Sequence, residues 1–263
     1  MIDIANSKVK NSINVGIRPD EVVVTPDSAH VYVNNYLSDT VSVIDVASGT
    51  TVGEPIEVGD RPSGLALAVT PDGLRVYVTN EGSNTVSVID VASNTVANTI
   101  QVGVSPKGVA VIPNGLHAYV TNEGSNTVSV IDVASGTTVG EPIEVGDRPD
   151  QVAIAPDGLH AYVTNGGSDD VSVIDIASGT VAPSIDVRNP PGGVTVDPGS
   201  RRAYVTNIVT GAVAVIDTAR NAIIDSIDVG DGPRGIAVTP DGRYAYVANY
   251  DSNNVSLIEI SGR

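Results

Sequence analysis

Six short loops of the sequence each carry one basic residue, although the chain as a whole is strongly acidic. The loops read GIRPDE, GDRPSG, GVSPKG, GDRPDQ, RNPPGG and GDGPRG. They hold six of the 14 lysines and arginines in a chain of net charge −17. Basic groups gathered in this way could bind the acidic group of a ligand or partner. The residues are Arg18, Arg61, Lys107, Arg148, Arg188 and Arg234.

A second polar set follows a recurring Tyr-Val-x-Asn motif, and we expect it to share one molecular face with the basic loops. Its amides could contact the same ligand, and Glu81 and Glu123 just after the motif are candidates for binding a divalent cation in a central channel. Alternatively, the acidic and basic side chains pair between repeats and the amides cap turns. The asparagines are Asn35, Asn80, Asn122, Asn165, Asn207 and Asn249.

The three histidines do not form a comparable cluster. His30, His117 and His160 each lie two residues before the tyrosine of the motif, which places them at the opposite end of the same strand. They are spread over separate repeats, so one metal ion could not bind all three. The sequence also lacks a nucleophile elbow, a phosphate-binding loop and an H-E-x-x-H pattern. We therefore predict no catalytic residue.

The sequence contains a repeat, and the strands of this repeat determine where these side chains lie. A strand pattern that ends in Val-Ile-Asp, or a variant of it, returns at intervals of 42 to 45 residues. Each repeat contains four short apolar stretches separated by turn residues, and none shows a helical period. Four strands per repeat of this length indicate a propeller blade. The strand pattern ends at Asp45, Asp90, Asp132, Asp175, Asp217 and Glu259.

We therefore predict an all-β, six-bladed β-propeller with four-stranded antiparallel blades, in which residues 1–263 form one domain and residues 17–263 form the six repeats. The last repeat stops after NNVSLIEI and lacks a fourth strand, whereas Ser7–Gly16 (SKVKNSINVG) resembles one. Residues 1–16 are thus expected to supply the outer strand of the last blade and to close the ring, which removes a free sheet edge. Met1–Asp3 repeats a third-strand pattern and is left over in this scheme.

Other recurring residues are expected to be structural. Pro-Asp-Gly at Pro71–Gly73, Pro156–Gly158 and Pro240–Gly242 is a tight-turn signature. The aspartate after Val-Ile suits a turn in which its carboxylate accepts backbone N–H groups. Serines in the middle of the third strands either pack closely or lie on the surface.

Composition narrows the possible partners. An acidic surface is unfavourable for nucleic acid, which binds basic proteins. There is no cysteine, and no apolar run approaches the roughly 20 residues that span a bilayer. The opening residues MIDIANSKVK contain no apolar core of a signal peptide. We expect a monomer.

The AYVTN, VSVID and PDG landmarks resemble the YVTN family of β-propellers, and this resemblance covers essentially the whole chain. It implies a protein of the cell surface, the extracellular space or the periplasm. Nearly identical blades without a unique catalytic cluster favour a non-enzymatic binding or scaffold module, whose partner is a protein or a small anionic ligand. The alternative is an enzyme at the channel mouth, similar to the lyases and lactonases of related propellers, in a form with or without a bound metal.

Overall fold

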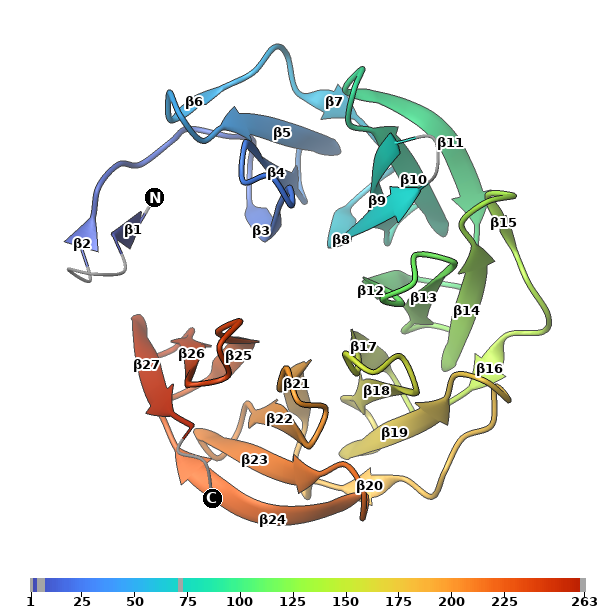
Figure 1. Ribbon diagram of the computed structural model, residues 1–263, viewed down its shortest axis with the longest axis vertical. Coiled ribbons are helices and arrows are strands. Elements are labelled where there is room, and N and C mark those ends of the chain that lie inside the picture. Colours follow the sequence, from blue (N-terminus) through green and yellow to red (C-terminus); the bar gives the residue numbers. More distant parts are fainter. Residues whose placement is uncertain (1, 4–7, 71–72, 261–263) are drawn as a thin grey trace.

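The computed structural model describes residues 2–3, 8–70 and 73–260, and it confirms an all-β propeller of six blades (Figure 1). The blades are antiparallel sheets arranged around a central axis, and they are numbered 1 to 6 along the chain. No helix occurs in these residues, so none of the described segments is a helix able to cross a membrane.

The blades share one topology, in which strands run from the axis to the rim in chain order. Blade 1 contains β3 (Pro19–Val24), β4 (His30–Asn35), β5 (Thr40–Asp45), β6 (Thr50–Thr51) and β7 (Ile56–Glu57). Blade 2 contains β8 (Pro62–Thr70), β9 (Gly73–Asn80), β10 (Thr85–Asp90) and β11 (Thr95–Gln101). Blade 3 contains β12 (Pro106–Val111), β13 (His117–Asn122), β14 (Thr127–Asp132), β15 (Thr137–Thr138) and β16 (Ile143–Glu144).

The remaining blades continue the pattern. Blade 4 contains β17 (Pro149–Ile154), β18 (His160–Asn165), β19 (Asp170–Asp175) and β20 (Ile185–Asp186). Blade 5 contains β21 (Pro191–Val196), β22 (Arg202–Asn207), β23 (Ala212–Asp217) and β24 (Ala222–Asp228). Blade 6 has three strands, β25 (Pro233–Val238), β26 (Tyr244–Asn249) and β27 (Asn254–Glu259).

The hydrophobic core lies between blades. Val41 and Val43 of blade 1, for example, pack against Leu65, Val76 and Val78 of blade 2. Because blades 2 to 5 each have a neighbour on both sides, their inner strands are apolar on both faces. The largest fully buried side chains are tyrosines and β-branched residues, as expected for a sequence without Phe or Trp.

Every inner strand contains a β-bulge just after its first proline. In blade 2 the pairing of β8 with β9 passes from Pro62 directly to Leu65, and the same shift occurs in the other five blades. Two residues per blade are thereby released from the ladder. Such bulges redirect side chains and are common beside functional sites.

The turns confirm the expected structural roles. Asp45 Oδ1 accepts the Ser48 N–H at 2.7 Å, and Asp90, Asp132 and Asp175 do the same for the serine three residues later. Gly158 and Gly242 adopt the positive φ that their turns require. Pro71 and Asp72 lie outside the described residues.

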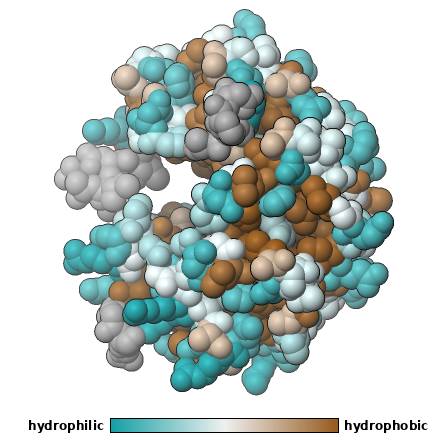
Figure 2. Space-filling model, turned by 45° about the vertical axis from the view of Figure 1, so that its right-hand side comes forward, coloured by the Kyte–Doolittle hydropathy of each residue, from teal (hydrophilic) through white to brown (hydrophobic). Residues whose placement is uncertain are grey.

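The predicted ring closure is wrong. Among the described residues, blade 6 has three strands, and neither β1 nor β2 pairs with β27. Instead β1 (Ile2–Asp3) pairs with β2 (Lys8–Val9), and this hairpin stands in a gap between blades 6 and 1 (Figure 1). Figure 2 shows an opening through the molecule on this side. Of the predicted outer strand, Lys8–Val9 is a strand, and its partner is β1. Met1 and residues 4–7 lie outside the described residues.

The gap predicts a contrast between two equivalent valines on third strands. Val86 of blade 2 is fully buried, whereas Val255 of blade 6 is 59% exposed. Val86→Asp buries an unpaired carboxylate and should lower the free energy of unfolding by about 4 kcal/mol or more. Val255→Asp should change it by less than about 0.5 kcal/mol. Chemical denaturation checks both, and a large loss in Val255→Asp would show that this face is covered in solution.

Candidate functional site

The two residues that each bulge releases lie at the axis, where the inner strands meet (Figure 1). Blades 1 and 4 place acidic and amide side chains there, and blades 3 and 6 each place one basic side chain. Glycine occupies the remaining positions apart from one serine. In blade order the pairs are Asp20–Glu21, Ser63–Gly64, Lys107–Gly108, Asp150–Gln151, Gly192–Gly193 and Arg234–Gly235.

Buried threonines on the second strands hold these pairs in place. Thr121 Oγ1 of blade 3 accepts the Gly108 N–H of its own blade at 2.8 Å and donates to the Asp150 carbonyl of blade 4 at 2.6 Å. Thr79 ties Gly64 to the Lys107 carbonyl in the same way, and Thr206 contacts the carbonyls of Gly193 and Arg234. These bonds fix the spacing of neighbouring inner strands at the axis.

Among the axial side chains, the position at the axis raises the pKa of Glu21 to a value near neutral pH. Its Oε2 accepts the Leu65 N–H of blade 2 at 2.8 Å, and its carboxyl also hydrogen-bonds with the side chain of Gln151 from blade 4. Burial is the main cause that raises the pKa of Glu21 to about 7, and the charges of Asp20 and Asp150 act in the same direction against the two hydrogen bonds. Glu21 therefore exchanges a proton near neutral pH, as a general base must.

Asp20 and Asp150 flank Glu21 and have raised pKa values. In both, removal of water by the surrounding protein is the main cause, and it outweighs the opposing charges of Lys107 and Arg234. Three carboxyl groups with raised pKa thus belong to the same axial cluster. Grouped carboxyls of this kind are typical of functional sites.

A chain of ion pairs surrounds the cluster. Lys107 Nζ lies 2.8 Å from Glu81 Oε2 and 3.5 Å from Glu123 Oε2. Arg61 pairs with Glu81 at 3.3 Å, and Arg148 pairs with Glu123 at 2.9 Å. Burial opposes the ionisation of Glu81, but the hydrogen bond and charge of Lys107 outweigh it and lower the pKa of Glu81. Burial of Lys107 lowers its pKa, but the hydrogen bond and charge of Glu81, together with the charge of Glu123, outweigh this effect and raise it.

The basic residues predicted as one ring therefore divide into two groups. Lys107 and Arg234 stand on the inner strands at the axis. The other four precede the proline and have a left-handed backbone, with φ between 52° and 67°. Two basic side chains stack on tyrosine rings, Arg18 on Tyr36 at 4.6 Å and Arg234 on Tyr250 at 5.0 Å. The four residues of the second group are Arg18, Arg61, Arg148 and Arg188.

The six asparagines of the motif are buried within their own blades. Asn122 Nδ2 donates to Thr127 and Ser129, and its Oδ1 accepts the Gly103 N–H at 3.1 Å. Asn35, Asn80, Asn165 and Asn249 make corresponding bonds to residues five and seven positions ahead. Asn207 donates to the Val187 carbonyl instead. The structure thus gives these amides the turn-capping role that the sequence left open.

The candidate metal residues Glu81 and Glu123 are bridged by Lys107. Among the described residues no group of three or more His, Cys, Asp or Glu side chains is arranged to hold a metal ion. His117 lies at the far end of its strand, with Nε2 3.9 Å from an Asp132 oxygen.

The comparisons with known proteins identify a family. Residues 9–185 match the family described as "Lactonase, 7-bladed beta-propeller". The chain belongs to this lactonase family. The matched segment includes the inner strands that carry Glu21, Lys107, Asp150 and Gln151. The propeller part of the resemblance noted above is thereby confirmed, whereas membership of the YVTN family stays a prediction.

Solved structures share the fold of this lactonase-family chain. A protein of Bacteroides uniformis, provisionally described as a 6-phosphogluconolactonase, is 16% identical with a TM-score of 0.79, covering 92% of this chain and 80% of its own. A functionally unknown protein of Desulfotomaculum acetoxidans is 18% identical with a TM-score of 0.78, covering 95% and 84%. Hydrazine synthase of Kuenenia stuttgartiensis is 23% identical with a TM-score of 0.63, covering 97% and 100%. No curated protein matches the sequence.

Sequence reasoning missed Asp20, Glu21, Asp150 and Gln151 in this lactonase-family site. A signal for Glu21 and Gln151 was present in the aligned loops, because four of the six repeats have glycine two residues after the bulge proline. Only these two depart from glycine.

The raised pKa of Glu21 predicts how stability depends on pH. The pKa of Glu21 is about 7 in the folded protein and 4.5 in the unfolded chain. The contribution of this carboxyl to the free energy of unfolding therefore falls as pH rises from 4.5 through about 7. Glu21→Gln cannot ionise, so its stability relative to the wild type should increase across this window.

Urea denaturation at several pH values measures the difference. Asp45→Asn is the control. Hydrogen bonds with Ser48 lower the pKa of Asp45 from 3.8, so the effect of its ionisation on stability changes with pH only below this window. A constant difference between Glu21→Gln and the wild type from pH 4.5 to 7 would contradict the assignment.

Proposed function

We propose that the protein is a hydrolase that opens a lactone, a cyclic ester, at the mouth of the axial channel, with Glu21 as the general base. The observation that carries the proposal is the half-buried Glu21 carboxyl, whose pKa of about 7 suits proton transfer at neutral pH. Membership of the lactonase family supports the reaction class. It favours this enzymatic alternative over the non-enzymatic scaffold that the repeats suggested.

The proposed reaction needs one proton acceptor and a site for developing negative charge. Water attacks the lactone carbonyl carbon while Glu21 takes its proton, and a tetrahedral oxyanion forms. The ring C–O bond then breaks, and Glu21 returns the proton to the alkoxide, which yields a hydroxy acid. Arg234 supplies the positive charge at the axis that stabilises the oxyanion.

The charges of the site favour an uncharged lactone over a phosphorylated one. The axial carboxyls Asp20, Glu21 and Asp150 would repel an anionic substrate, and the chain as a whole carries a net charge of −17. Three of the six basic residues expected to bind an anion, Arg61, Lys107 and Arg148, are already paired with glutamates. A neutral, hydroxylated sugar lactone fits this environment better than the phosphorylated lactone named for the Bacteroides protein.

Hydrolysis of glucono-δ-lactone, followed by acid release, tests the proposal. Glu21→Gln should lower kcat by about 10²- to 10⁴-fold, since general base catalysis contributes about that much. The wild-type rate should rise with pH through about 7 as Glu21 loses its proton.

Glu57→Gln, an exposed residue of the rim strand β7, is the control and should keep full activity. The phosphorylated lactone should be hydrolysed more slowly than the neutral one. Failure to hydrolyse either lactone, or full activity in Glu21→Gln, would refute the proposal.

A further inference from the structure

The chain contains the dipeptide Asn-Gly twice, at Asn114–Gly115 and at Asn165–Gly166. An asparagine before glycine loses its side-chain amide readily, because glycine has no Cβ to shield the backbone nitrogen that attacks the side chain. The two pairs lie in different surroundings. Asn114 is exposed in the turn between β12 and β13, whereas Asn165 is fully buried at the end of β18. The fold therefore gives two copies of one reactive pair different protection.

Two hydrogen bonds hold the turn that contains Asn114. Asn114 Oδ1 accepts the Leu116 N–H at 3.0 Å. The Gly115 N–H donates to the Ile112 carbonyl at 2.8 Å, and Gly115 has a φ of 74°. Among the described residues, no hydrogen bond holds the Asn114 Nδ2 group. A local opening of this exposed turn is therefore enough to bring the Gly115 nitrogen to the Asn114 side chain.

The turn of blade 4 shows that an aspartate fits the position of Asn114. Asp157 Oδ1 accepts the Leu159 N–H at 2.9 Å. The Gly158 N–H donates to the Ala155 carbonyl at 2.8 Å, and the φ of Gly158 is also 74°. Conversion of Asn114 to aspartate would thus preserve both bonds of its turn.

The second pair is held inside blade 4. Asn165 Nδ2 donates to Asp170 Oδ1 at 2.7 Å and to Ser172 Oγ at 2.9 Å. The Gly166 N–H donates to the Arg148 carbonyl at 2.9 Å. The amide of Asn165 cannot turn toward the Gly166 nitrogen until these bonds break and the blade opens. An aspartate there would also place a second carboxylate beside Asp170 and lose both donors.

We propose that Asn114 is a site of covalent modification, at which the folded protein exchanges a side-chain amide for a carboxylate while Asn165 stays intact. The modification adds one negative charge to an exposed turn of blade 3. It makes this turn chemically the same as the Pro-Asp-Gly turn of blade 4.

The reaction needs only water and a solvent base such as hydroxide. The Gly115 nitrogen attacks Asn114 Cγ while the base takes its proton, and the Cγ–Nδ2 bond breaks to release ammonia, whose third proton comes from water. Water then adds to Cγ of the cyclic imide. The bond between Cγ and the Gly115 nitrogen breaks, which restores the backbone N–H and leaves aspartate. One water is consumed and one ammonia is released, and no atom is oxidised or reduced.

Attack of water on the other imide carbonyl would give isoaspartate, whose backbone is longer by one carbon. The length of this turn is fixed by the Ile112 N–H, which donates to the His117 carbonyl at 3.0 Å and ends the pairing of β12 with β13. Isoaspartate does not fit between these residues without disturbing that bond. Aspartate is therefore the product that the folded turn retains.

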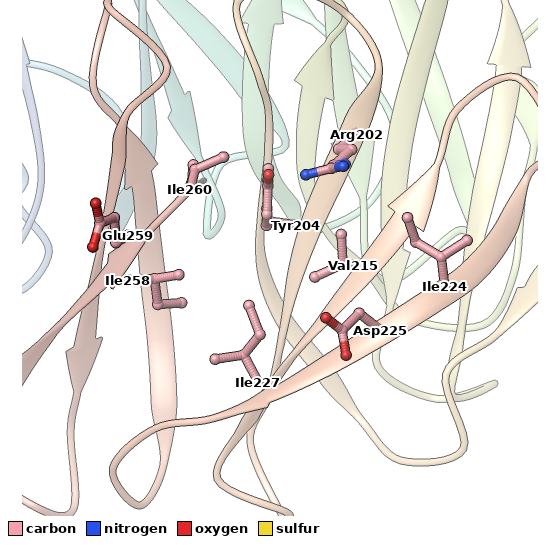
Figure 3. A pocket seen from close by; sticks show the side chains of 9 residues that line it. All are labelled: Arg202, Tyr204, Val215, Ile224, Asp225, Ile227, Ile258, Glu259 and Ile260. Atoms are coloured by element: carbon pink, nitrogen blue, oxygen red, sulfur yellow. The ribbon is translucent and has the colours of Figure 1, made fainter. Parts of the chain in front are cut away.

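The turn of Asn114 lies at the end of the blades remote from the channel mouth. His117 begins β13 in blade 3. In blade 5 the same position is taken by Arg202, beside a pocket of about 300 Å³ between β24 and the end of β27 (Figure 3). The proposed hydrolysis uses Glu21 at the other end of the inner strands. The modification of Asn114 does not depend on that function, and the failure of either proposal leaves the other unaffected.

Incubation of the full chain in neutral buffer, followed by proteolysis and tandem mass spectrometry, tests the site. We expect the mass gain from amide to acid at Asn114, at a rate at least about tenfold above that at Asn165, because more hydrogen bonds must break at Asn165. The same incubation in urea should modify both asparagines at similar rates. Equal rates in the folded chain, or no gain at Asn114 by the time the urea sample is fully converted, would overturn the proposal.

Two matched variants test the fit of the product. Asn114→Asp should leave the Tm unchanged, because Asp157 makes the same bond in blade 4. Ion-exchange chromatography of incubated samples should resolve two charge forms of the wild type and one form of this variant. Asn165→Asp should lower the Tm, because its carboxylate would face Asp170. A fall in the Tm of Asn114→Asp as large as that of Asn165→Asp would overturn the assignment of Asn114.

Discussion

The propeller depends on the buried hydroxyl that joins the inner strand of one blade to that of the next. Thr79, Thr121 and Thr206 each contact the backbone of their own first strand and a carbonyl of the following blade. In blade 1, Asn34 replaces the threonine and contacts the carbonyls of Pro62 and Ser63. A buried polar atom left unpaired is costly, so these bonds allow little variation in the distance between inner strands. The close approach in turn explains the glycines at positions such as Gly64 and Gly193, where a β-carbon would clash with the carbonyl oxygen of Lys107 or Arg234 in the next blade.

The repeat and its turns could be predicted from the sequence because they depend on local chemistry. Strand patterns, proline and glycine positions and the aspartate turns all act within a few residues. The axial site could not be predicted in the same way, because the bulge after each proline decides which residues leave the ladder. Asp20 and Asp150 belong to similar loops. The bulge that follows each proline is what turns their side chains, and that of Glu21, toward the axis. The prediction of ring closure was wrong for a related reason. A fourth-strand pattern such as Ser7–Gly16 does not reveal with which third strand it pairs.

Identical sequences in this chain make different contacts. Thr40–Pro62 and Thr127–Pro149 are the same, letter for letter. Yet Arg61 pairs with Glu81 of its own blade, whereas Arg148 pairs with Glu123 of the preceding blade, where its own blade has Gly166. The neighbour, and not the copied segment, thus decides the ion pair. This dependence explains why the expectation of a uniform basic ring did not describe the electrostatics of the mouth.

The limits of the copied block have a consequence for how such a chain can diversify. The block begins at the third strand of one blade and ends at the first proline of the next, so it spans the junction between two blades. Gene duplication of this unit transfers an intact seam, while the residues just after the proline fall outside it. Each new blade can therefore acquire its own axial side chains without disturbing the joint that holds it to its neighbour.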